Sequence, residues 1–113
     1  MIEVTILDYL KSILSVPVYM VKSKDDLPSC FYVLEKTGGA QENHINSSTF
    51  VVQSYADSMY QAASLNESVI DVMLNRLIEL GDIASVKLNS DYNFTDTTTK
   101  WYRYQAVFDI THY

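Results

Sequence analysis

The pattern of apolar positions between Ser58 and Leu80 predicts one long amphipathic helix. Apolar residues recur there at steps of three and four, so they share one face of a helix with about 3.6 residues per turn. These residues are Leu65, Val69, Val72, Met73, Leu77 and Leu80. Ser58 with Gln61 fits a capping box at the start, and Gly81 fits the left-handed position that often ends a helix. A face of this length has to be covered, and a sheet could run along it.

A shorter helix is predicted for residues 2–14, where five apolar side chains share one face. They are Ile6, Leu7, Leu10, Ile13 and Leu14. Pro17 prevents this helix from continuing, because proline lacks a backbone donor and its ring clashes with the preceding turn. The chain is therefore expected to leave the helix at Ser15 and Val16.

Five further segments have the composition or the alternation of β-strands. They are Val18–Lys22, Cys30–Thr37, Thr49–Tyr55, Ile83–Leu88 and Lys100–His112. In the last of them, every second residue from Tyr102 to Ile110 is apolar. The residues at the alternate positions, which include Trp101 and Arg103, are mixed in character. Such alternation predicts a sheet that has one face under helices and one face free.

These segments together predict one α+β domain over residues 1–113. A chain of 113 residues is long enough to bury a core of its own. We expect an antiparallel or mixed sheet of about five strands, with the long helix and the short helix packed on one face. The expected order along the chain is αβββαββ.

Two polar segments separate predicted strands. Residues 38–48 contain one large apolar side chain, Ile45, and we interpret them as a long hairpin loop or arm. Such a segment could be a mobile surface loop, or it could become ordered on a neighbouring subunit. Residues 89–99 are interpreted as a polar loop that carries two exposed aromatic residues, Tyr92 and Phe94.

The composition narrows the classes of partner. Fourteen acidic and 8 basic residues give a net charge of −6, which opposes binding along a phosphate backbone. Nine tyrosines favour surfaces that are half apolar and half wet. The single cysteine, Cys30, cannot form an internal disulfide. With no basic leader and no apolar run near the ~20 residues of a membrane span, we expect a protein kept in the cytoplasm or in something assembled there.

The sequence offers little catalytic or metal-binding chemistry. His44 and His112 have no cysteine or carboxylate at ligand spacing. The series Asp91, Asn93, Thr95 imitates a calcium loop, but Asp96 stands where that loop requires glycine. We therefore predict no catalytic residues, no cofactor and no metal, and a protein that is not an enzyme.

The candidate functional residues are instead those suited to protein contacts. Tryptophan, tyrosine and arginine are the residue types that anchor interfaces. We therefore expect Trp101 and Arg103 on the free sheet face or its edge, covered by another subunit, together with Tyr92 and Phe94. In the arm, the candidates are Asn43, His44, Ile45 and Asn46. The interleaved aromatic residues around Trp101 could also stack bases, but the acidic balance of the chain opposes this.

Two stretches resemble a known group of proteins. They are HINSSTFVVQSYADSMYQAASLNESV and the ending SVKLNSDYNFTDTTTKWYRYQAVFDITHY. These stretches are similar to small structural proteins of long-tailed phages and prophages of Gram-positive bacteria, described as tail-terminator, tail-completion or head-tail joining proteins and sometimes as minor tail or capsid components. The resemblance extends from about Val18 to Tyr113 and follows the overall pattern instead of a catalytic signature.

The resemblance implies an α+β subunit of a ring, commonly a hexamer, that caps the tail tube and joins it to the neck proteins of the virion. Its place would be the virion, assembled in the cytoplasm of a bacterial host. DNA would at most pass through the ring, with no sequence-specific binding and no membrane contact. Within this class, a tail tube or minor capsid protein is the alternative. Outside it, the alternative is a cytoplasmic α+β module that binds a small ligand or a protein, marked by a pocket.

Overall fold

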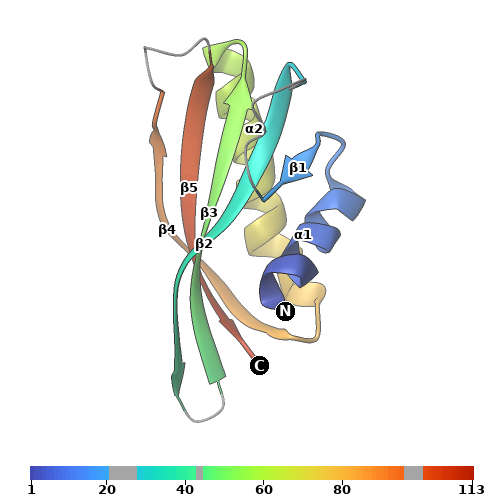
Figure 1. The fold of residues 1–113 in the computed structure, drawn as a ribbon, viewed down its shortest axis with the longest axis vertical. Coiled ribbons are helices and arrows are strands. Elements are labelled where there is room, and N and C mark those ends of the chain that lie inside the picture. The colour runs from blue at the N-terminus through green and yellow to red at the C-terminus, as the bar shows by residue number, and fades with distance from the viewer. Residues whose placement is uncertain (21–27, 43–44, 96–100) are drawn as a thin grey trace.

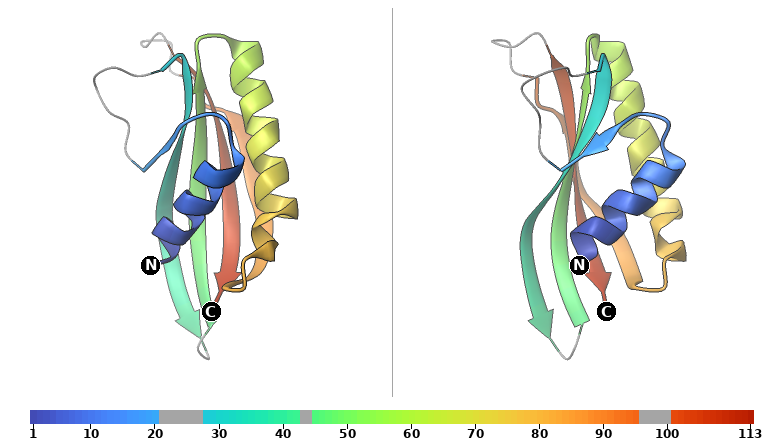
Figure 2. Two further views of the ribbon diagram at one scale, coloured as in Figure 1. Left: turned by 90° about the vertical axis from the view of Figure 1, so that its right-hand side faces the viewer. Right: turned by 45° about the vertical axis from the view of Figure 1, so that its right-hand side comes forward.

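The computed structural model describes residues 1–20, 28–42, 45–95 and 101–113. Two helices lie on one side of a five-stranded sheet whose strand order is β1-β2-β3-β5-β4 (Figures 1 and 2). The strands are β1 (Val18–Tyr19), β2 (Cys30–Glu42), β3 (Ile45–Ala56), β4 (Ile83–Asn93) and β5 (Tyr102–His112). The helices are α1 (Ile2–Ile13) and α2 (Met59–Asn75), and a short 3₁₀ helix follows at Leu77–Glu79. The predicted α+β class, with its one long and one short helix, is confirmed.

The sheet is mixed because β1 pairs parallel to β2, whereas the other three pairings are antiparallel. The parallel contact is short and joins Val18 and Tyr19 to Tyr32 and Val33. β2, β3, β5 and β4 therefore alternate in direction across the sheet.

The main core lies between the helices and one face of the sheet. Phe50 on β3 and Phe108 on β5 are register partners at its centre, and both are fully buried. Val69 and Met73 from α2 and Leu10 from α1 pack into the same cluster. The apolar parity of the last strand thus faces the helices, as the alternation predicts.

The long helix begins as predicted but ends earlier. Ser58 is the N-cap, and its Oγ accepts a hydrogen bond of 3.2 Å from the backbone N–H of Gln61. The helix ends at Asn75, not at Leu80, and the chain tightens into the 3₁₀ turn that carries the fully buried Leu77. Gly81 does not adopt the predicted left-handed conformation. The turn into β4 is instead closed by backbone hydrogen bonds, including one of 3.1 Å from Ile83 N–H to the Leu80 carbonyl.

The interpretation of residues 38–48 as a loop is wrong for the described part of that range. β2 continues to Glu42 and β3 starts at Ile45, so both sides of the range are paired strands in one long ribbon (Figure 1). The backbone N–H and C=O groups of these residues find hydrogen-bond partners across the two strands, whatever the side chains are. The polar side chains are mostly exposed. Apolar alternation reports burial, so an exposed ribbon lacks the pattern that marks a strand.

The interpretation of residues 89–99 as a polar loop is wrong in its first half. β4 extends to Asn93, which pairs with Tyr104, and its outer residues are largely exposed. A register shift between Leu88 and Ser90 interrupts the alternation, which hides the strand in the sequence. Residues 96–99 lie outside the described part of the chain.

Candidate functional site

The face of the sheet opposite the helices carries a second, smaller apolar cluster. Phe31 on β2 stacks on Tyr55 of β3, with ring centroids 4.8 Å apart and planes at 7°. Trp101 packs edge-on against Phe31 at 5.2 Å, and Tyr19 does the same from the other side at 5.9 Å. Phe31 is fully buried and Tyr55 is nearly so. The face that the sequence leaves free is therefore partly covered by its own aromatic residues.

Arg103 extends this cluster toward β4. Its Nε donates to the Phe94 carbonyl at 3.0 Å, and its Nη1 donates to the Tyr55 hydroxyl at 3.0 Å. The guanidinium carbon also lies 4.2 Å from the centroid of the Phe94 ring, in cation–π contact. Neither hydrogen-bond acceptor is a carboxylate, so these contacts hold the side chain in place without cancelling its charge.

A chain of side-chain hydrogen bonds crosses three strands beside the cluster. The Tyr55 hydroxyl donates to Gln53 Oε1 at 2.9 Å, and Gln53 Nε2 donates to Gln105 Oε1 at 3.1 Å. Gln105 Nε2 then donates to the Tyr92 hydroxyl. Side chains fixed in this way lose little further rotamer freedom when a partner binds, which makes this face a preorganised surface.

The resulting surface, called the aromatic strip below, crosses all five strands. Its outer end is the most accessible: Tyr92 and Phe94 are 40% and 45% exposed and contact each other at 5.8 Å. Its residues are Tyr19, Phe31, Tyr55, Trp101, Arg103, Phe94 and Tyr92. The centre of the aromatic strip is therefore buried by the chain itself, and exposed aromatic residues remain at its ends.

The structure brings together four of the predicted interface residues and separates two others, Ile45 and Asn46, from them. Trp101, Arg103, Tyr92 and Phe94 all belong to the aromatic strip. Asn43 and His44 lie outside the described residues.

Ile45 and Asn46 stand at the distal start of β3, in the ribbon. Asn46 is nine residues from Tyr55 along that strand, which is roughly 30 Å at the usual strand rise. The candidate contacts therefore form two separate regions, the aromatic strip and the ribbon.

Sequence reasoning missed the role of His112, for which it notes only the lack of a cysteine or carboxylate at ligand spacing. The side chain is 7% exposed, and its Nε2 lies 2.8 Å from the Ser48 hydroxyl. The signal was present, because His112 continues the buried parity of Phe108 and Ile110. The hydrogen bond ties the end of β5 to the first half of β3.

Residues that imitate a calcium loop are engaged in internal hydrogen bonds. Asp91 Oδ1 accepts from Asn66 Nδ2 of α2, and Asn93 Oδ1 accepts from the Thr95 hydroxyl at 2.6 Å. Among the described residues, no group of three or more His, Cys, Asp or Glu side chains could hold a metal ion.

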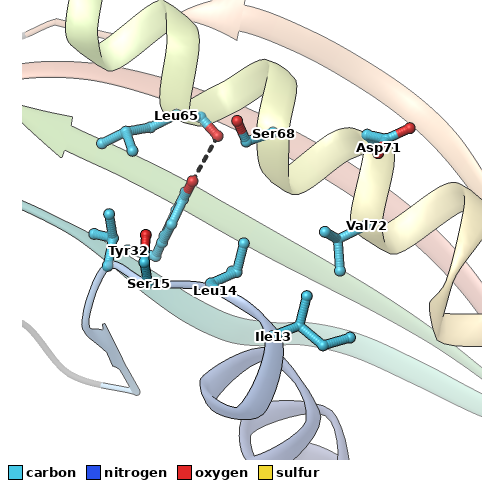
Figure 3. A pocket seen from close by; sticks show the side chains of 9 residues that line it. Ile13, Leu14, Ser15, Tyr32, Leu65, Ser68, Asp71 and Val72 are labelled. Atoms are coloured by element: carbon cyan, nitrogen blue, oxygen red, sulfur yellow. Dashed lines mark hydrogen bonds between the residues drawn. The ribbon is translucent and has the colours of Figure 1, made fainter.

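A hollow of about 320 Å³ opens between the end of α1 and the middle of α2. Figure 3 shows its lining, in which Tyr32 rises from the sheet and donates a hydrogen bond of 2.8 Å to the Leu65 carbonyl. Ser68 and Asp71 supply its polar rim on α2. Other hollows on the described surface have volumes of about 320 to 360 Å³, so size does not single this one out.

Comparison with models of known protein families finds no match, and comparison with curated proteins finds none either. Among the described residues, no helix is both long enough and apolar enough to cross a membrane.

Proposed function

We propose that this protein is a structural subunit of a phage or prophage particle, a tail terminator or head-tail joining protein. It acts by assembling into a ring, commonly a hexamer in proteins of this kind, and by contacting tail tube and neck proteins. The ring is part of the virion and forms in the cytoplasm of the bacterial host. The resemblance of the two quoted stretches to such proteins motivates the proposal.

The observation that carries it is the bare β2–β3 ribbon. Eight consecutive residues of β2, Glu35 to Glu42, are exposed, and the far end of the β2–β3 ribbon extends beyond both helices (Figure 2). β3 stays paired with β5 from Ala56 to Asn46, so this stretch of β2 is the outer strand of the sheet, with open backbone groups on its far side. A ribbon of this length is therefore suited to a partner surface, and an assembly subunit provides one in the next copy.

The aromatic strip offers a second contact region. It holds the only tryptophan of the chain beside an arginine and several tyrosines, which are the residues that most often anchor interfaces. In the proposed function, its exposed end at Tyr92 and Phe94 contacts another virion protein.

The charge of the chain supports a ring that DNA traverses. A net charge of −6 repels phosphates, so DNA passing through such a ring would slide and not bind. A tail tube or minor capsid protein has the same requirements and is the alternative within this class.

Deletion of the gene from an inducible prophage tests the proposal. Electron microscopy of the induced lysate should show heads and tails that are not joined, or tails of abnormal length. Expression of the intact chain from a plasmid should restore infectious particles. A deletion strain that releases normal infectious particles would overturn the proposal.

The second candidate is a binding module for a small ligand, and the hollow beside Tyr32 is the observation that favours it. Its volume of about 320 Å³ lies at the lower end of the range for ligand pockets. A metabolite screen by thermal shift tests this candidate, because a ligand that binds only the native state raises the melting temperature. A hit that loses its effect in a Ser68→Trp variant would place the ligand in this hollow.

A further inference from the structure

The sheet has two open edges in the described part of the chain. β1 covers the outer edge of β2 only at Tyr32 and Val33, so β2 has no outer partner from Leu34 to Glu42. β4 ends the sheet on the other side and has no outer partner along Ile83–Asn93. Each open edge presents a row of backbone N–H and C=O groups that can pair with another strand.

The two open edges occupy the same range of positions along the strand direction. Reading across the register, Leu34 aligns with Val52, then with Ala106, and then with Asp91. At the other end, Gln41 aligns through β3 and β5 with Ile83. The open part of β2 therefore matches β4 in length and in position along the strands.

The strand directions also match. β2 and β4 point in opposite directions, because the four strands from β2 to β4 alternate. A second copy placed beside the first by rotation about an axis along the strands keeps those directions. Its β4 therefore meets β2 as an antiparallel partner, the pairing already used within this part of the sheet.

The charges at the two edges are complementary in this arrangement. On the free face, Glu35 lies level with Ser90 and diagonal to Lys87 of the next copy. On the helix face, Lys36 lies level with Leu88 and diagonal to Asp91. Both diagonals pair an acid with a base, at the roughly 7–8 Å that separates such neighbours in a ladder.

The helix face adds an apolar contact. Leu88 is 39% exposed at the edge of the sheet. The aliphatic stem of Lys36, level with it in the next copy, would cover this side chain while its ammonium group stays in water.

We propose that the open edge of β2, Leu34–Gln41, pairs with the open edge of β4, Ile83–Asp91, of a second copy of this chain. The contact is heterologous, and the edges meet without an offset along the strands, so repetition adds no rise and closes a ring where the rotation between copies divides a full turn. The inference specifies the interface of the proposed function and rests on that function only for its place in a virion.

Cysteine cross-linking of the full chain tests the pairing. Glu35→Cys and Ser90→Cys, each in a Cys30→Ser background, are mixed at high concentration and oxidised, and a covalent dimer of the two variants is expected. The matched control replaces Ser90→Cys by Glu67→Cys, which lies on the exposed side of α2. Cross-linking equal to that of the control overturns the pairing. Preferential linking of Ser90→Cys to itself would also overturn it in favour of a symmetric β4–β4 contact.

Charge exchange tests the same interface in assembly. Glu35→Lys or Lys87→Glu alone should weaken self-association about threefold to tenfold in sedimentation velocity, since attraction becomes repulsion. The double variant Glu35→Lys/Lys87→Glu should restore self-association. The control is Glu67→Lys with Lys11→Glu, which changes charges away from the two edges. A double variant as weak as either single variant overturns the proposal.

The same variants separate this inference from the proposed function. If prophage deletion blocks head-tail joining but Glu35→Lys complements fully, the edge pairing fails and the function stands. If deletion leaves particles normal while the purified chain cross-links at Glu35 and Ser90, the function fails and the edge pairing stands.

Discussion

Ser48 on β3 and His112 on β5 share a buried hydrogen bond of 2.8 Å between Oγ and Nε2. The two residues lie on the helix face, two positions apart in register, because Asn46 is the direct partner of His112 and Ile110 is the direct partner of Ser48. β5 accompanies β3 as far as Asn46, so in the described part of the chain only the pair Glu42 and Ile45 extends past it. The hydrogen bond therefore fastens the last residue of β5 to β3.

Replacing His112 should loosen this junction. His112→Ala leaves the buried Ser48 hydroxyl without its partner, so the free energy of unfolding should fall by about 1–3 kcal/mol. Urea denaturation measures the change, and Thr111→Ala on the opposite face of β5 is the matched control. A loss no larger than that of the control would show that the hydrogen bond contributes little to stability.

The pH dependence of stability should change when Tyr32 is replaced. Burial raises the pKa of Tyr32 above its ordinary value of 10.0, and a nearby Cys30 adds to the effect. The folded chain therefore holds Tyr32 neutral, and the stability from this group is complete below pH ~10, where the unfolded tyrosine titrates. It is then lost as the pH rises from there toward the higher folded pKa.

Comparison of Tyr32→Phe with the unchanged chain isolates that effect. The variant should lose about 1 kcal/mol at pH 7, because the hydrogen bond to the Leu65 carbonyl is gone. Above pH ~10 its stability should decline less steeply than that of the unchanged chain. Urea midpoints at several pH values measure both, and Tyr60→Phe, at an exposed tyrosine of α2, is the control. Equal slopes for all three proteins would contradict the prediction.

Trp101 should contribute less to folding than a residue of the main core. It packs on Phe31 and Tyr55 on the free face and is only partly buried. Trp101→Ala should therefore lower the free energy of unfolding by about 2 kcal/mol and leave a folded domain, against about 4 kcal/mol for Phe108→Ala. Chemical denaturation followed by circular dichroism measures both. If Trp101→Ala unfolds the domain, the second cluster is part of the essential core.

The ribbon should be dispensable for folding and required for assembly. Replacing residues 40–47 by Asn-Gly closes β2 and β3 with a tight type I′ turn just beyond Gly39 and Ser48, which are register partners. Its mostly exposed side chains bury little apolar area, so the unfolding free energy should change by about 1 kcal/mol or less. Self-association and complementation of the prophage deletion should be lost. Full complementation by the shortened chain would remove the ribbon from the proposed function.

The sequence alone predicts the elements whose side chains alternate between core and solvent. The start of α2 at Ser58, the short helix before Pro17 and the buried parity of β5 follow from periodicity and capping, which are local properties. Gln41 and Ser90 belong to extensions of β2 and β4 that the sequence does not reveal. These extensions are held by backbone pairing to β3 and β5, and exposed side chains carry no record of it.

The sequence by itself determined which residue types could act, whereas the tertiary structure decided which of them meet. Tryptophan, tyrosine and arginine mark contact chemistry in any context. Only the strand order β1-β2-β3-β5-β4 places Tyr19, Phe31 and Trp101 side by side, although they come from distant parts of the chain. The same order leaves β2 and β4 as open edges. Strand order depends on long-range pairing, which a local pattern of apolar and polar residues does not encode.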